Sequence, residues 1–194
     1  MTAEHTIYAL WAAWAASWTI ARLWANRTEK RAGIGAELLF RALLFIGGIV
    51  LFAFPAPDHY RAQMQLWNCG DVLRWIMVAL TLGGLLFTWW ARVHLGRLWS
   101  DLIVKKAGHH VVDTGPYRLV RHPIYSGLML AAFATAIEKG TSFALLGATI
   151  WAVAFYTKAR REERFLRAEL GEGAYGAYAR KTPMLLPFGR IQTR

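Results

Sequence analysis

The sequence predicts an all-α, polytopic integral membrane protein with about five transmembrane helices. Three observations favour this fold class. Hydrophobic residues make up 56% of the 194 residues, and ten Trp and ten Phe are among them. This share is high for a soluble domain. Five apolar stretches follow one another along the chain, and the basic residues gather in alternate segments between them.

The apolar stretches cover about residues 7–24, 38–54, 72–90, 124–137 and 143–156. A helix needs about 20 apolar residues to cross the hydrocarbon layer, and the first three stretches approach that length. The last two are shorter, and only residues 138–141 separate them. We expect a tight helical hairpin here, crossing a locally thinned bilayer. A single kinked re-entrant element is the alternative.

The distribution of Lys and Arg predicts the topology. The segment after the first stretch, the segment after the third and the C-terminal tail carry most of these residues, whereas the alternate segments hold only Arg61 and Lys139. The positive-inside rule then places the N-terminus outside and the C-terminus in the cytoplasm. In a bacterium the membrane would be the plasma (inner) membrane. No basic region precedes the first stretch, so we expect it to remain as a span rather than to be a cleaved signal.

Composition also limits the partners. The net charge of +11 would suggest nucleic acid in a soluble protein, but no nucleic-acid module is recognisable. In a membrane protein these charges set topology and meet anionic lipid, so membrane lipid is the expected partner. Cys69 is the single cysteine, which excludes an intrachain disulfide. No Cys ligand set or His-x-x-x-His spacing is present, so we expect no metal.

We expect one membrane domain over residues 1–194, with three spans in 1–94 and a polar loop, the hairpin and the tail in 95–194. In the loop, Gly115-Pro116 indicates a turn and His122-Pro123 a helix start. The N-terminus of that helix suits an anionic group. After the fifth stretch, Lys158 and Glu162 are four residues apart and share one helix face. A carboxylate there is a candidate for binding a cation, and a solvated, salt-bridged helix is the alternative.

Residues 115–127 (GPYRLVRHPIYSG), the Glu162-Glu163 pair and the following tyrosines resemble the isoprenylcysteine carboxyl methyltransferase family. That family and the related phospholipid N-methyltransferases are integral membrane enzymes that use S-adenosylmethionine. The resemblance covers about residues 95–188 and implies a cytoplasmic cofactor pocket near the C-terminal half. The cofactor-binding residues that it implies are His109, Val111, Val112, Tyr117, His122, Pro123, Ile124, Tyr125 and Glu162.

The resemblance also implies catalytic residues. The family has an arginine four residues before its glutamate, and this sequence has Lys158 there. Arg160 or Arg161 is the alternative source of a guanidinium, so the expected catalytic set is Lys158, Glu162 and Arg161. Compared with the family pattern, the chain also has one extra residue between Gly171 and the pair formed by Tyr175 and Tyr178.

The expected reaction is methyl transfer from S-adenosylmethionine to a lipid-like or prenylated acceptor at a carboxylate. Glu162 would pair with the cofactor's ammonium, and Tyr117 or Tyr125 would offer an aromatic face to the cationic methyl centre. The helix start near His122 would receive the cofactor's carboxylate. Three alternatives stay open: a phospholipid or small-molecule N- or S-methyltransferase, an NADPH-dependent membrane reductase of similar layout, and a non-enzymatic scaffold. Amine methylation would need a base, such as Glu163 or a histidine.

Overall fold

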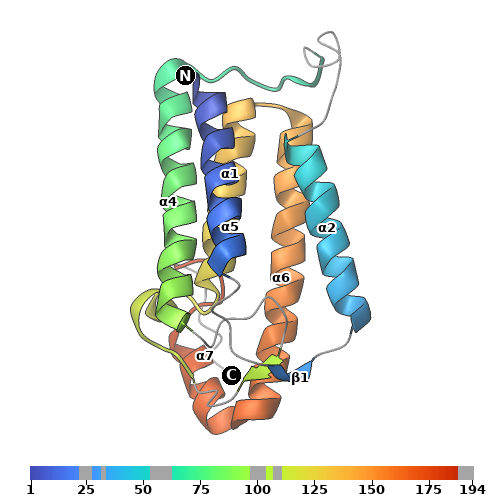
Figure 1. Ribbon diagram of the computed structural model, residues 1–194, viewed down its shortest axis with the longest axis vertical. Helices are drawn as coiled ribbons and strands as arrows, with labels where there is room; N and C mark the ends of the chain where they lie inside the picture. The colour runs from blue at the N-terminus through green and yellow to red at the C-terminus, as the bar shows by residue number, and fades with distance from the viewer. Residues whose placement is uncertain (22–27, 32–33, 53–62, 97–103, 107–110, 188–194) are drawn as a thin grey trace.

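The computed structural model describes residues 1–21, 28–31, 34–52, 63–96, 104–106 and 111–187. Five long helices lie side by side along its longest axis (Figure 1): α1 (Ala3–Ala21), α2 (Ile34–Phe52), α4 (Asp71–Leu95), α5 (Pro123–Lys139) and α6 (Ser142–Gly171). The predicted all-α class is confirmed. Two very short antiparallel strands, β1 (Thr28–Arg31) and β2 (Val104–Lys106), were not predicted.

The direction of the chain alternates from helix to helix, as the charge pattern predicts. β1 and β2 lie at one end of the bundle, together with the start of α5 and the last turns of α6 (Figure 1). The segments predicted to be rich in Lys and Arg adjoin these elements, so we call this the basic end. The start of α1, the start of α4 and the α5–α6 connection lie at the opposite end (Figure 1).

The hairpin predicted for the last two apolar stretches is confirmed, and the single re-entrant element is wrong. α5 ends at Lys139, Gly140 adopts a left-handed φ of 63°, and α6 begins at Ser142. The Thr141 hydroxyl caps α6 by accepting a hydrogen bond from the Ala144 N–H at 3.2 Å. α6 continues to Gly171, well beyond the predicted apolar stretch, so the charged segment that follows Tyr156 is part of the same helix.

Among the described residues, three helical segments are long and apolar enough to span a membrane: Gly35–Phe52, Asp71–Leu95 and Ser142–Lys181. Many large apolar side chains on α2 and α4 point away from the bundle, among them Phe45, Ile49, Trp75 and Leu86. Such extended apolar surface is typical of contact with lipid rather than water. The chain is therefore an integral membrane protein, while the count of five spans stays a prediction.

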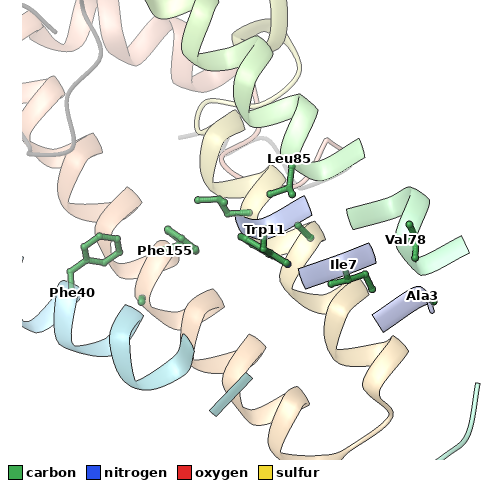
Figure 2. Close-up of a cluster of buried hydrophobic side chains, with 10 residues drawn as sticks. Ala3, Ile7, Trp11, Phe40, Val78, Leu85 and Phe155 are labelled. Atoms are coloured by element: carbon green, nitrogen blue, oxygen red, sulfur yellow. The ribbon is translucent and has the colours of Figure 1, made fainter. Parts of the chain in front are cut away.

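The bundle interior is held by aromatic side chains and by close helix contacts. Figure 2 shows Trp11 among buried residues of α1, α2, α4 and α6. Its indole N–H donates to the Thr135 hydroxyl at 3.0 Å, and the Trp151 indole donates to the Leu44 carbonyl at 2.8 Å. A Cβ built on Gly84 would lie 2.6 Å from the Gly127 carbonyl oxygen, so α4 and α5 approach at backbone distance. This contact fixes the position of α5, whose start forms the candidate site.

Candidate functional site

The candidate site lies at the basic end, where the loop before α5 meets the charged half of α6. A 3-10 turn (Gly115–Arg118) leads to α5, with Gly115 at a φ of 57°. A Cβ on Gly115 would lie 2.7 Å from the His94 ring, so the turn packs directly on the end of α4. His94 also lies 2.8 Å from the Thr114 hydroxyl and stacks on Tyr117. These contacts hold the loop in one position beside α5.

The Glu162 carboxylate is held by two side chains from the start of α5. The Tyr125 hydroxyl donates to Glu162 Oε1 at 2.7 Å, and His122 Nδ1 lies 3.3 Å from Glu162 Oε2. The rings of His122 and Tyr125 are stacked, 5.5 Å apart and nearly parallel. The two contacts orient the carboxylate, and the Glu162 side chain as a whole retains 19% exposure.

The neighbouring Glu163 is buried and paired. Arg121 Nε lies 2.6 Å from Glu163 Oε1, and His122 Nε2 lies 3.4 Å from the same oxygen. Burial alone would raise the pKa of Glu163, but His122 and Arg121 outweigh it and lower that pKa to about 2. Burial disfavours the charged form of His122, yet the two glutamates raise its pKa. Glu163 is therefore ionised at neutral pH and is a weak proton acceptor.

Residues 177–187, here called the C-terminal strap, cover the start of α5. The Arg121 guanidinium donates to the Ala179 carbonyl at 2.8 Å and to the Thr182 carbonyl. The backbone N–H groups of Arg121 and His122 donate to the carbonyls of Pro183 and Met184 at 2.9 and 3.1 Å.

Two side chains complete the attachment of the strap. The Ser126 hydroxyl donates to the Leu185 carbonyl at 2.6 Å, and the Tyr178 hydroxyl donates to the Tyr117 carbonyl at 2.6 Å.

Pro123 has no N–H, so the N–H groups of Ile124 and Tyr125 are the first-turn donors of α5 that lack a partner inside the helix. The start of α5 therefore offers an anion fewer backbone N–H donors than the sequence suggested.

The two cations predicted to be catalytic face α2. Lys158 is only 5% exposed, and its Nζ lies 3.5 Å from Glu37 Oε2 and 4.1 Å from the centre of the Phe40 ring. Arg161 donates to the Ala36 carbonyl at 2.9 Å. Lys158 and Arg161 therefore gather at the α2–α6 contact, while Glu162 turns toward α5.

The structure brings together four of the predicted cofactor-binding residues at the basic end: Tyr117, His122, Tyr125 and Glu162. The others lie apart from this polar network. Val111 packs against the cluster formed by Tyr175 and Tyr178, and Ile124 packs against the bundle core. Pro123 is fully buried and Val112 is half-buried. His109 lies outside the described residues.

The ring of Tyr125 has two near-parallel neighbours, His122 at 5.5 Å and Phe155 at 5.2 Å. Its hydroxyl orients Glu162, and its ring surface is taken up by these contacts. Tyr117 is 8% exposed and stacks on His94, and burial is the main cause that raises its pKa. Of the two tyrosines, Tyr117 is thus the better candidate to face a cation, and its phenol stays neutral.

The sequence reasoning missed the Arg121–Glu163 ion pair and the C-terminal strap. From the sequence, Arg121 received no role of its own, and Glu163 received only that of an alternative base. The signal was present in two dipeptides of opposite charge, Arg121-His122 and Glu162-Glu163. They lie at the two ends of the predicted hairpin. A hairpin places such ends together, so pairing of opposite charges could have been expected.

Comparison with known proteins identifies the family. The family model described as the isoprenylcysteine carboxyl methyltransferase (ICMT) family matches residues 76–168. A cobalt-zinc-cadmium resistance protein, CzcN, of Cupriavidus metallidurans is 32% identical over 48% of this chain and 43% of its own length.

Two plant relatives are named as methyltransferases. A probable protein-S-isoprenylcysteine O-methyltransferase of Oryza sativa subsp. indica is 32% identical over 61% of this chain and 56% of its own length. Protein-S-isoprenylcysteine O-methyltransferase B of Arabidopsis thaliana is 25% identical over 72% of this chain and 79% of its own length. The chain spans about half the length of the bacterial and rice relatives. The matched region runs from α4 to the charged half of α6 and contains Tyr117, His122, Tyr125 and Glu162, so the candidate site lies in the part of the chain that resembles the isoprenylcysteine carboxyl methyltransferase family.

Proposed function

We propose that the protein is an S-adenosylmethionine-dependent methyltransferase that acts on a lipid-like or prenylated acceptor at a carboxylate. One observation carries the proposal: within the family-matched region, the Glu162 carboxylate is oriented by Tyr125 and His122, and the Glu162 side chain remains 19% exposed. The names of the plant relatives support the same reaction. The name of the Cupriavidus relative states no reaction.

The residues at the basic end fit the cofactor by their chemistry. S-adenosylmethionine carries an ammonium, a carboxylate and a sulfonium, and when bound it supplies a methyl group on positively charged sulfur. Glu162 would hold the ammonium, and the first-turn N–H groups of Ile124 and Tyr125 would hold the carboxylate. The Tyr117 ring would face the sulfonium.

The charges favour a carboxylate acceptor over an amine. A carboxylate is already ionised at neutral pH and needs no base, only a cation to position it. Lys158 is that cation, because it is buried and already binds a carboxylate, that of Glu37. An amine acceptor would need a base to remove a proton. Glu163 is poorly suited to this because its pKa is lowered to about 2.

Binding of S-adenosylhomocysteine by the purified protein in detergent tests the cofactor assignment. We expect wild type to bind in isothermal titration calorimetry and Glu162→Gln to lose binding. Tyr125→Phe removes one hydrogen bond to a charged group, worth about 1.5 kcal/mol, and should weaken binding roughly tenfold. Tyr156→Phe is the matched control, since Tyr156 is 49% exposed on α6. Binding of NADPH without binding of S-adenosylhomocysteine would refute the proposal.

Transfer of a labelled methyl group from S-adenosylmethionine to membranes tests the acceptor. A methyl ester is cleaved by mild base, so the label should be released as methanol. Label that stays in lipid after base treatment would show N-, O- or S-methylation instead and would refute the carboxylate as acceptor.

A further inference from the structure

A second polar site lies at the opposite end of the bundle, away from Glu162. A cavity of about 280 Å³ opens there near the start of α4 and the end of α5. Gln65, Asn68, Arg74 and Glu138 are among its polar lining residues, and Val50, Leu51 and Phe143 are among the apolar ones. The methyl-transfer site described above shares none of these residues.

Glu138 and Arg74 carry opposite charges and both line this cavity, but among the described residues they form no close ion pair. Glu138 is only 7% exposed, and among the described residues no hydrogen bond or ion pair to its carboxylate is found. Arg74 is fixed through Nε, which donates to the Cys69 carbonyl at 3.1 Å, and no ion pair joins it to Glu138 within the described residues.

The other charges at the rim are tied to one another. Lys139 Nζ donates to the Tyr8 hydroxyl at 2.7 Å, and that hydroxyl donates to Glu4 Oε1 at 2.9 Å. Glu138 and Arg74 are therefore the charges that the cavity offers to a ligand.

A buried carboxylate without a partner is costly, so a ligand that brings a cation would stabilise Glu138. The guanidinium of Arg74 has further N–H donors, whose geometry matches phosphate. A ligand with one ammonium and one phosphate would satisfy both residues at once. The cavity lies where α4 begins and α5 ends, at one end of the bundle (Figure 1). In a bundle that spans a membrane, the ends of the helices lie near the lipid headgroups.

We propose that this cavity binds the phosphoethanolamine headgroup of a membrane phospholipid, with the ammonium at Glu138 and the phosphate at Arg74. The apolar residues of the wall then contact the upper part of an acyl chain. This site is independent of the proposed methyl transfer.

Titration of the detergent-purified protein with short-chain phosphatidylethanolamine and phosphatidylcholine, followed by native mass spectrometry, tests the proposal. The quaternary ammonium of choline has no N–H to donate to Glu138, so we expect at least tenfold preference for the ethanolamine lipid. Glu138→Gln should abolish that preference, whereas Arg74→Gln, which removes a contact to the phosphate that both lipids share, should weaken the binding of both lipids at least tenfold. Asp71→Asn is the matched control, because Asp71 is exposed in the first turn of α4 and does not line the cavity.

An unchanged thermal unfolding transition shows that a variant is folded, and if Glu138→Gln does not fold, the loss of affinity in Arg74→Gln carries the test. Equal affinity of wild type for the two lipids would overturn the proposal, as would an unchanged preference in folded Glu138→Gln or an unchanged affinity for both lipids in folded Arg74→Gln. Equally strong binding of soluble phosphoethanolamine would overturn the assignment to a lipid and leave the free compound as ligand.

Discussion

Arg121 and Glu163 form an ion pair of 2.6 Å whose side chains are 4% and 6% exposed. Arg121 lies just before α5 and also donates to two carbonyls of the C-terminal strap, whereas Glu163 lies in the charged half of α6. The pair thus joins three parts of the chain at the basic end. Glu162, the residue adjacent to Glu163, depends on the same arrangement for its orientation toward Tyr125.

Replacing Glu163 by Gln should destabilise the protein by about 3 kcal/mol, because it leaves the buried Arg121 without its counter-charge. The measurement is the free energy of unfolding in one detergent. Glu172→Gln is the control, since Glu172 pairs with Arg167 at the surface, where the side chains are 63% and 33% exposed. Such a pair is worth less than about 1 kcal/mol. Equal losses in the two variants would contradict the assigned role of the buried pair.

The stability of wild type should fall in acid through Glu163. Its pKa is lowered from 4.5 to about 2 in the folded protein. The stabilisation is therefore complete above the unfolded pKa and is lost as the pH falls through the folded one. Between pH 4.5 and about 2, wild type should lose stability relative to Glu163→Gln, as unfolding curves at several pH values would show. Parallel pH profiles of the two proteins would contradict the lowered pKa.

His122 should act in the opposite direction. Its pKa is raised from the ordinary value of 6.5, so its contribution to stability is complete below pH 6.5 and is lost as the pH rises through the folded pKa. Replacement by Gln should remove this loss on the alkaline side. A wild-type stability that does not change above pH 6.5 would show that the two glutamates do not hold the proton on His122.

The sequence was sufficient to predict what depends on side-chain pattern. The hairpin, the helix start at Pro123 and the meeting of the segments around His122 and Glu162 all follow from apolar spacing, proline chemistry and chain direction. The continuation of α6 to Gly171 could also have been predicted, because the Lys, Arg, Glu and Leu residues between 158 and 170 are good helix formers.

Two features of the site were beyond such reasoning. The C-terminal strap binds α5 mainly through the backbone carbonyls of Ala179, Thr182, Pro183 and Met184, and side-chain identity does not encode those contacts. The pairing of Lys158 with Glu37 depends on how α2 packs against α6, and the two residues are 121 positions apart in the chain. A local sequence pattern cannot predict a contact between two residues that lie so far apart in the chain.

The contact of α4 with α5 predicts different effects for two adjacent glycines. A Cβ on Gly84 would lie 2.6 Å from the Gly127 carbonyl, whereas a Cβ on Gly83 would meet nothing within 4 Å. Gly84→Ala should therefore destabilise by roughly 1–3 kcal/mol through overpacking. Gly83→Ala should be neutral or stabilising by up to about 1 kcal/mol, because alanine is the better helix former. Thermal unfolding of both variants distinguishes the effects, and a loss in Gly83→Ala as large as that in Gly84→Ala would show that the backbone contact does not limit packing.

The pairing of Lys158 with Glu37 predicts a competition, if the proposed function holds. Glu37 Oε2 lies 3.5 Å from Lys158 Nζ, in the position that an acceptor carboxylate would take, so the acceptor must displace it. Glu37→Gln removes the competing charge and should lower the KM for a carboxylate acceptor, such as an N-acylated S-prenylcysteine, several-fold without changing kcat. The affinity for S-adenosylhomocysteine should stay the same, because Glu162 is held by Tyr125 and His122 rather than by Glu37. Glu172→Gln serves again as the surface control. An unchanged or raised KM in Glu37→Gln would show that Lys158 serves the α2–α6 contact and does not receive the acceptor.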